Sequence, residues 1–226
     1  MMDPPRGVVF DLDGTLIDSG GDIVTAVNRA LEVHGRTRVP ASTLLRFVGD
    51  GARMLCARAA GLPEKSAEVD PIVETYLEYY LEHPTDFTRW MPHARAVLDE
   101  LRHYRIAIAT NKPRATTDVV LGRLGVRSLF AAVVAGGDVP AIKPSPLPIL
   151  EIARQLNLEP SQLVMVGDGP QDVEAGRRAG TRTIGVAGGF LPVERLTASQ
   201  PDVLVDSLAE LPPILSRWED ATVRAK

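Results

Sequence analysis

The segment "VVFDLDGTLIDSGG" at residues 8–21 places Asp11 and Asp13 one residue apart, directly after an apolar run. Two carboxylates this close disfavour each other's ionised form unless a cation or a proton separates them. One aspartate could be a nucleophile bound to a metal ion while its neighbour carries a proton. An isolated Asp-x-Asp at a strand end is more often only part of a turn, so the interpretation depends on what else the chain supplies.

Three later segments supply residues of matching chemistry, each close behind another apolar run. Asp168 and Asp172 bring the carboxylates to four, and a carboxylate-rich oxygen site suits a hard divalent cation such as Mg²⁺. Threonine, lysine and backbone N–H groups are the donors that an anionic phosphoryl group needs. The three segments are "TNK" (110–112), "KPSP" (143–146) and "GDGPQD" (167–172).

Six short apolar runs predict the strands that would position these residues. Each run is too short for a helix and apolar on both faces, as in a parallel sheet covered on both sides. Segments of helical spacing alternate with them, which predicts a doubly wound, Rossmann-like α/β domain. Ligands of such a sheet bind beyond the carboxyl ends of its strands, where the polar segments fall. The runs are residues 7–10, 105–109, 131–135, 163–166, 183–186 and 203–205.

One long interval interrupts the alternation and predicts a second domain. Residues 18–86 are far too many for an ordinary loop between a strand and a helix, and they include two amphipathic helical patterns, "DIVTAVNRALEVHG" and "IVETYLEYYLEH". We therefore expect residues 18–86 to form a small helical domain inserted after the first strand. Residues 1–17 and 87–226 would form the α/β core.

The four polar segments, in this order, resemble the motifs of the haloacid dehalogenase superfamily. The resemblance extends over essentially the whole chain, because the insertion is similar to the helical cap of that superfamily. Within it, the chain looks most like the phosphoglycolate phosphatases. The resemblance implies a Mg²⁺-dependent phosphatase that hydrolyses a small phosphate monoester, for which 2-phosphoglycolate is the first candidate.

The resemblance also implies catalytic roles for three residues. Asp11 would attack phosphorus and form an aspartyl-phosphate, and Asp13 would protonate the leaving oxygen and later activate water. Lys143 would bind the phosphoryl group and offset the charge of Asp11.

Binding roles follow in the same way. Thr110, Asn111 and Lys143 would contact the phosphoryl oxygens, and Gly14 would allow a tight turn that brings backbone N–H groups to the phosphate. Asp172 could alternatively be only a helix cap, and Lys112 is expected to be exposed. The metal ligands implied by the resemblance are Asp11, the backbone carbonyl of Asp13, Asp168 and Asp172.

In the insertion, "VGDGAR" is the candidate segment for contact with the substrate. Asp50 and Gly51 lie in a glycine-flanked turn, and Arg53 could pair with a carboxylate on the substrate. The alternative is an ordinary helix start with a solvated arginine.

Other chemistries of the superfamily fit less well. Dehalogenases lack the second aspartate of the first motif, whereas Asp13 is present here. Phosphonate-cleaving members need a lysine soon after that motif, but the first one in the insertion is Lys65. A sugar phosphomutase would carry a histidine there, so mutase activity is a minor alternative, behind hydrolysis of another small phosphate ester or of pyrophosphate.

Composition narrows the partners further. The 226-residue chain has a net charge of −4 and no basic patch, so the expected partner is a small phosphorylated metabolite and not a nucleic acid. No apolar run reaches the length of a membrane span, and the N-terminus does not resemble a signal peptide. Cys56 is the sole cysteine, which favours a cytoplasmic location. The sequence gives no indication of oligomeric state.

Overall fold

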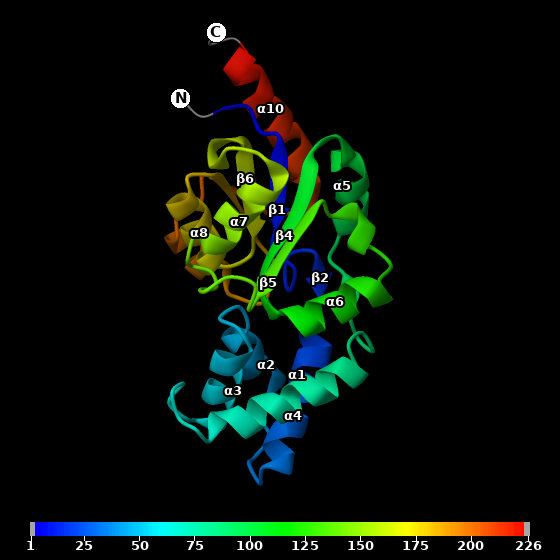
Figure 1. Cartoon of the computed structure of the whole chain (residues 1–226), viewed down its shortest axis with the longest axis vertical. Helices are drawn as coiled ribbons and strands as arrows, with labels where there is room; N and C mark the ends of the chain where they lie inside the picture. Colours follow the sequence, from blue (N-terminus) through cyan, green and yellow to red (C-terminus); the bar gives the residue numbers. More distant parts are fainter. Residues whose placement is uncertain (1–2, 224–226) are drawn as a thin grey trace.

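The computed structural model describes residues 3–223, the last three of them as backbone alone. Its centre is a six-stranded, wholly parallel sheet with the order β5-β4-β1-β6-β7-β8, which confirms the predicted α/β fold (Figure 1). The strands are β1 Gly7–Phe10, β4 Arg105–Pro113, β5 Ala132–Gly136, β6 Leu163–Gly167, β7 Arg182–Val186 and β8 Val203–Val205.

Helices cover both faces of this sheet, which explains why its strands are apolar throughout. Val8 and Phe10 belong to one apolar cluster, together with residues of α5, α6 and α10. Val9 points the other way, into a second cluster with residues of α7 and α8. The core helices are α5 Ala94–Glu100, α6 Arg114–Arg123, α7 Leu147–Leu156, α8 Pro170–Ala179, α9 Val193–Ala198 and α10 Leu211–Val223. Short 3₁₀ turns cover Leu45–Phe47, Leu101–His103, Arg127–Leu129, Pro160–Gln162 and Leu208–Glu210.

The order of the strands places the carboxyl end of β1 at a topological switch point. The chain runs outward from β1 through β4 and β5 on one side, then returns and runs outward through β6, β7 and β8 on the other. Loops on the two sides of β1 therefore diverge and leave a crevice above it, the usual ligand site of such a sheet. Asp11 is the first residue after β1.

The first four helices of the chain, α1–α4, lie together beyond this edge of the sheet (Figure 1). Both ends of the chain lie at the opposite end of the molecule. The apolar face of α1, with Ile23, Val27 and Leu31, is buried in the same cluster as Ile72 and Tyr76 of α4. We call α1–α4 the cap helices; the boundaries 18 and 86 for a cap domain stay a prediction. These helices are α1 Gly20–Val33, α2 Ala41–Leu44, α3 Ala52–Ala60 and α4 Val69–Glu82.

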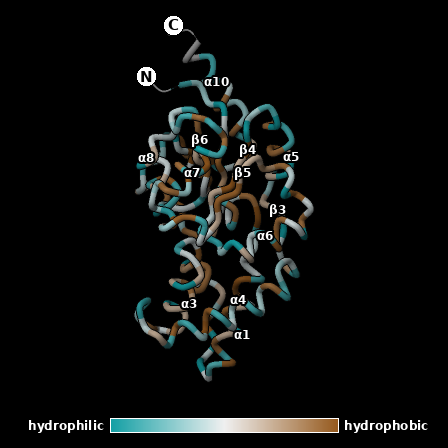
Figure 2. The backbone as a smooth tube through the Cα atoms, viewed as in Figure 1, coloured by the Kyte–Doolittle hydropathy of each residue, from teal (hydrophilic) through white to brown (hydrophobic). Residues whose placement is uncertain are grey.

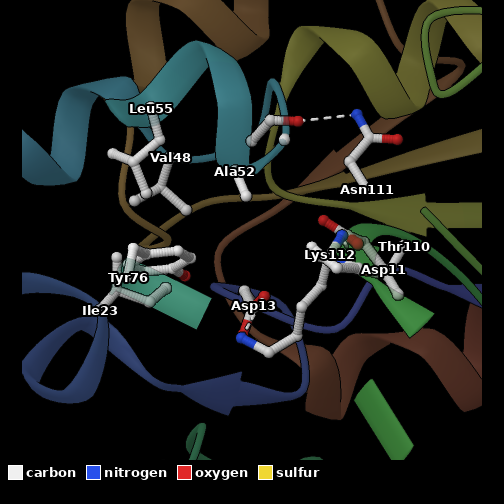
Figure 3. Close-up of a pocket in the computed structure, with 13 residues that line it drawn as sticks. Asp11, Asp13, Ile23, Val48, Ala52, Leu55, Tyr76, Thr110, Asn111 and Lys112 are labelled. Atoms are coloured by element: carbon white, nitrogen blue, oxygen red, sulfur yellow. Dashed lines mark hydrogen bonds and ion pairs between the residues drawn. The ribbon is translucent and has the colours of Figure 1, made fainter. Parts of the chain in front are cut away.

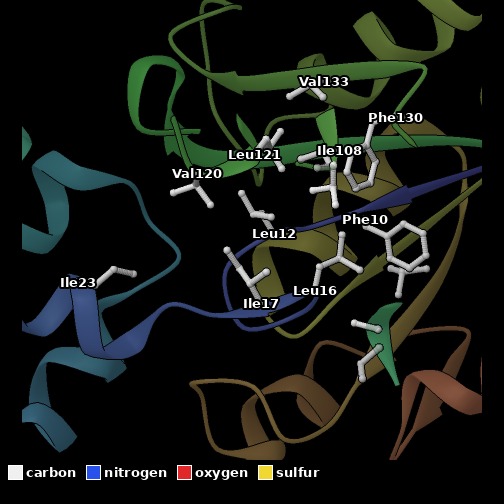
Figure 4. Close-up of a cluster of buried hydrophobic side chains, with 14 of the residues drawn as sticks. Phe10, Leu12, Leu16, Ile17, Ile23, Ile108, Val120, Leu121, Phe130 and Val133 are labelled. Atoms are coloured by element: carbon white, nitrogen blue, oxygen red, sulfur yellow. The ribbon is translucent and has the colours of Figure 1, made fainter. Parts of the chain in front are cut away.

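The two chain segments that join the cap helices to the core lie side by side. Strands β2 (Ile17–Asp18) and β3 (Arg89–Trp90) pair antiparallel, and the buried carboxylate of Asp22 accepts hydrogen bonds from the Phe87 N–H and the Thr88 hydroxyl, at 3.0 and 2.6 Å. Beside them, apolar side chains of the first motif, of β4 and of α6 pack into one cluster (Figure 4). This packing fixes both connections directly beside the end of β1.

Hydrophobic residues are concentrated inside both parts of the molecule, and hydrophilic residues occupy the surface (Figure 2). None of the helices within residues 3–223 combines the length and apolar character needed to cross a membrane.

Candidate active site

Three carboxylates meet beyond the carboxyl ends of β1 and β6. One oxygen from each of Asp11, Asp168 and Asp172 lies within 4.8 Å of the others, and all three residues are buried. Asp168 follows β6, and Asp172 projects from the first turn of α8, where its Oδ2 also accepts the N–H of Gly169 at 3.0 Å. Asp172 therefore combines both roles expected for it, as helix-terminal acceptor and as a member of the carboxylate group.

Lys143 holds this group together. Its Nζ lies 2.9 Å from Oδ1 of Asp11 and 2.6 Å from Oδ1 of Asp172, and its side chain is 1% exposed. Burial lowers the pKa of Lys143, but the two carboxylates outweigh that effect, so its pKa is raised and the ammonium stays charged. One buried cation thus faces three buried carboxylates.

Burial and neighbouring charges shift the pKa of two of these carboxyl groups. Burial raises the pKa of Asp11 to about 7, with Lys143 opposing the shift and Asp172 adding to it. Burial, then the charges of Asp11 and Asp172, raise the pKa of Asp168 to about 8. The negative charge of these buried carboxylates is not fully balanced by Lys143, and carboxylate oxygens of this kind are the ligands that a divalent cation requires.

Glycines leave room for this group. Gly14 has φ +91°, and a Cβ on it would lie 2.5 Å from Oδ2 of Asp168. A Cβ on Gly189 would also overlap Asp168, and one on Gly167 would overlap Asp172. The backbone therefore lies so close to the carboxylates that only glycine fits at these three positions. The carboxylate oxygens gathered here fit a hard metal ion.

Asp13 is not a member of this group and has its own partners. The Ser19 hydroxyl donates to Oδ1 of Asp13 at 2.5 Å, and Nζ of Lys112 lies 3.1 Å from both of its carboxylate oxygens. The expected exposure of Lys112 is wrong: its side chain is 3% exposed, and it also donates to the Tyr80 hydroxyl at 2.9 Å. A buried lysine needs such partners, and Asp13 and Tyr80 provide them.

A cavity of about 40 Å³ opens between the Asp13–Lys112 pair and the cap helices (Figure 3). From the core, Asp11, Asp13 and Thr110 line it. From the cap, the lining is mainly apolar and includes the side chains of Ile23, Val48, Leu55 and Tyr76. The cavity can therefore present a small ligand to both aspartates, against a mainly apolar wall from the cap.

Asn111 bonds to the backbone of both the core and the cap. Its carboxamide donates to the carbonyl oxygens of Lys143 and Gly49 at 2.9 and 2.7 Å, and accepts the Lys143 N–H at 2.8 Å. Figure 3 shows the bond to the cap segment. The side chain therefore fixes the backbone of Lys143 and holds the cap against the core, and both Thr110 and Asn111 line the cavity.

The "VGDGAR" segment reaches the core through its glycines. Gly49 has φ +114°, and a Cβ there would lie 2.7 Å from Nε2 of Gln171. Gly51 lines the cavity, and a Cβ on it would lie 3.2 Å from Cδ1 of Ile142. Both glycines of this turn therefore pack closely against protein atoms of the core.

The two charged residues of that segment do not reach the cavity. Arg53 donates to the carbonyl oxygens of Glu64 and Ser66 at 2.9 and 3.2 Å and pairs with Asp70. These acceptors hold its guanidinium on the outer side of the cap. Asp50 precedes α3 and pairs with Arg58, a residue of that helix, at 2.6 Å. We therefore do not retain Arg53 and Asp50 as substrate ligands.

Gly14 lies in the tight turn that follows Asp13, with φ +91°. Its own N–H donates to the carbonyl of Ile17 at 2.8 Å, so this donor is used within the turn. The space it leaves for Asp168 is what requires a glycine here.

Comparison with known proteins agrees with this geometry. Residues 8–186 match the family of haloacid dehalogenase-like hydrolases. The chain belongs to that family. A phosphoglycolate phosphatase of Haemophilus influenzae is 34% identical over 215 residues, covering 91% of this chain and 96% of that protein.

Other relatives of this hydrolase differ in the substrate they are named for. An N-acetylmuramic acid 6-phosphate phosphatase of Pseudomonas aeruginosa is 32% identical, covering 94% of this chain and 95% of that protein. The crystal structure of a predicted phosphoglycolate phosphatase from Haemophilus somnus superposes with a TM-score of 0.83 at 27% identity, covering 93% and 97% of the two chains. The family is therefore shared across relatives with different substrates.

Three members of the hydrolase site were missed by sequence reasoning. Ser19 and Tyr80 contact Asp13 and Lys112, and the Thr15 hydroxyl donates to Oδ1 of Asp168 at 2.8 Å. Ser19 and Thr15 lie within the first motif segment, so their nearness in sequence to Asp13 was an available signal. Nothing local in the sequence distinguishes Tyr80 from a packing tyrosine.

Replacing Lys143 by methionine should cost about 3–5 kcal/mol of unfolding free energy, because it leaves Asp11 and Asp172 buried without their cation. Chemical denaturation in a metal chelator measures this loss. Lys65→Met, which makes the same change at an exposed cap position, should shift stability by less than about 0.5 kcal/mol. Equal stability of the two variants would contradict a charge-holding role for Lys143.

Proposed function

We propose that this hydrolase is a Mg²⁺-dependent phosphatase of small phosphate monoesters, with 2-phosphoglycolate as the first candidate substrate and an aspartyl-phosphate on Asp11. The observation that carries the proposal is the arrangement around Asp11. Asp11 follows β1, belongs to a buried group with Asp168, Asp172 and Lys143, and lines one cavity together with Asp13 and Thr110. We also propose that residues 18–86 act as the cap domain that encloses the substrate.

Asp11, Asp168 and Asp172 would hold the Mg²⁺ ion. When bound, such an ion supplies positive charge that stabilises the phosphoryl oxygens in the transition state. Lys143 keeps the Asp11 carboxylate oriented and offsets part of its charge, so a phosphate dianion can approach it. The Thr110 hydroxyl, which lines the same cavity, is placed to donate to a phosphoryl oxygen.

The first half of the reaction transfers the phosphoryl group to Asp11. A carboxylate oxygen of Asp11 attacks phosphorus, the bond from phosphorus to the ester oxygen breaks, and Asp13 donates a proton to that oxygen as it leaves. Ser19 and Lys112 fix the Asp13 carboxyl group by hydrogen bonds, so it faces the cavity in one orientation.

The second half regenerates the enzyme. Asp13, now a carboxylate, accepts a proton from water as the water oxygen attacks phosphorus, and the bond from phosphorus to the Asp11 oxygen breaks. Inorganic phosphate and both original carboxyl groups result. The apolar cap lining limits other water molecules, which favours transfer to the one that Asp13 activates.

The small size of the cavity supports a compact substrate over a sugar phosphate. With the cap in this position the cavity is narrow, about 40 Å³, and a compact leaving group is accommodated more readily than a sugar. The relatives named for phosphoglycolate support the same choice, whereas the relative named for N-acetylmuramic acid 6-phosphate represents the larger alternative.

Phosphate release from a small and a large phosphate ester, measured in Mg²⁺, tests the proposal. We expect kcat/KM for 2-phosphoglycolate to exceed that for N-acetylmuramic acid 6-phosphate by at least about tenfold, because the larger group requires the cap to open. A higher kcat/KM for the sugar phosphate would reject the small substrate, and the absence of phosphate release from every ester would reject the phosphatase.

A further inference from the structure

One cationic side chain lines the cavity within the described part of the chain, and it belongs to Lys112. Lys143 lies beneath Asp11, where two carboxylates occupy its ammonium, and it is not part of the cavity wall. Arg53 is held on the outer side of the cap by Asp70 and two carbonyl groups. A negative group on the leaving part of a substrate would therefore meet Lys112 first.

Lys112 is also close to the place where that leaving part must lie. Asp13 has to present an oxygen to the leaving oxygen of the substrate, and Nζ of Lys112 is 3.1 Å from both oxygens of Asp13. The first atoms beyond the leaving oxygen are thus within reach of the ammonium group. In 2-phosphoglycolate a single carbon separates the ester oxygen from the carboxylate.

The other walls offer little else for a charged leaving group. Val48, Leu55 and Tyr76 contribute apolar surface from the cap, and the Tyr80 hydroxyl accepts a hydrogen bond from Lys112 at 2.9 Å. A carboxylate bound there without a cation would be desolvated at high cost. A carboxylate on Lys112 would instead form a charge-assisted hydrogen bond in a largely buried place.

We propose that Lys112 determines substrate specificity by binding a carboxylate one carbon away from the scissile ester oxygen, so that the substrates are phosphate esters of short 2-hydroxy acids. The proposal rests on the phosphatase function above. Lys112 then donates to Asp13 and Tyr80 in the free enzyme, and to Asp13, Tyr80 and the substrate carboxylate in the complex. Its three N–H donors are sufficient for Asp13, Tyr80 and one carboxylate oxygen.

The test compares Lys112→Met with wild type on two substrates, 2-phosphoglycolate and ethyl phosphate, which has a similar chain but no carboxylate. We expect the kcat/KM ratio of the two substrates to fall by about 10- to 100-fold in Lys112→Met, the loss of one hydrogen bond to a charged group. Lys65→Met, the same change at an exposed cap position, should leave the ratio unchanged. Wild type should also be inhibited by glycolate and not by ethylene glycol, which tests the site without any variant.

Equal losses on both substrates in Lys112→Met would mean that Lys112 serves only Asp13, and would overturn the proposal. So would equal kcat/KM for the two substrates in wild type, or equal inhibition by glycolate and ethylene glycol. Failure of the phosphatase function is distinct, because wild type would then release phosphate from neither ester.

Discussion

Asp11→Asn should lower kcat for phosphate esters by at least about 1,000-fold, because an amide cannot act as the nucleophile and is a poorer ligand for a cation. The loss should be in the chemical step, since asparagine has nearly the shape of aspartate and the other residues that line the cavity are unchanged. Lys143 keeps its partner Asp172 at 2.6 Å in this variant, so the buried ammonium is not left without a counter-charge. Phosphate release under saturating substrate measures the effect.

Stability separates this result from simple unfolding. Removing one of three crowded carboxylates relieves repulsion, so the free energy of unfolding of Asp11→Asn should equal or exceed that of wild type when no metal is bound. Asp99→Asn makes the same change at an exposed position of α5 and should leave kcat unaltered. Turnover of Asp11→Asn near the wild-type rate would remove Asp11 as nucleophile.

Replacing Mg²⁺ by Ca²⁺ should abolish measurable turnover, as should a chelator. Mg²⁺ holds octahedral geometry at short distances, whereas Ca²⁺ accepts more oxygens and bidentate carboxylates. With Ca²⁺, both oxygens of Asp11 would be engaged as ligands, and none would be free to attack phosphorus. Phosphate release in each cation, after removal of all metal, measures the dependence.

Binding must be shown separately from activity in that experiment. Both cations should raise the denaturation midpoint of wild type, since either offsets the charge of Asp11, Asp168 and Asp172. Full activity in the chelator, or equal activity with both cations, would contradict the metal-dependent mechanism.

The sheet could be predicted because its signal is local. Each run is apolar on both faces, and alternation with helical segments leaves few topologies. The ends of the strands were less predictable: β4 continues to Pro113, four residues beyond the predicted strand, and its residues Thr110, Asn111 and Lys112 are buried although they are polar. Polar residues in a buried strand end carry no apolar signal.

Asp11 and Asp168 could be assigned because each directly follows a strand, and a position at a strand end largely determines where the side chain points. The burial of Lys112 could not be predicted, because it depends on Asp13 and Tyr80, which are 99 and 32 residues away in the sequence. The position of the Arg53 side chain could not be predicted for a similar reason. Its acceptors lie in the segment before α4 and at the start of that helix. For long cationic side chains, the partners decide the position, and sequence alone does not reveal which partners are near.

The covalent intermediate is the most direct test of the account. Wild type turning over 2-phosphoglycolate in Mg²⁺ is quenched with acid within the first turnovers, digested, and analysed by mass spectrometry for the peptide that contains residues 8–14. We predict a phosphoryl group on Asp11 that forms before free phosphate accumulates and is absent in Asp11→Asn. Steady phosphate release with no phosphoryl group on that peptide, or with one on another residue, would contradict it.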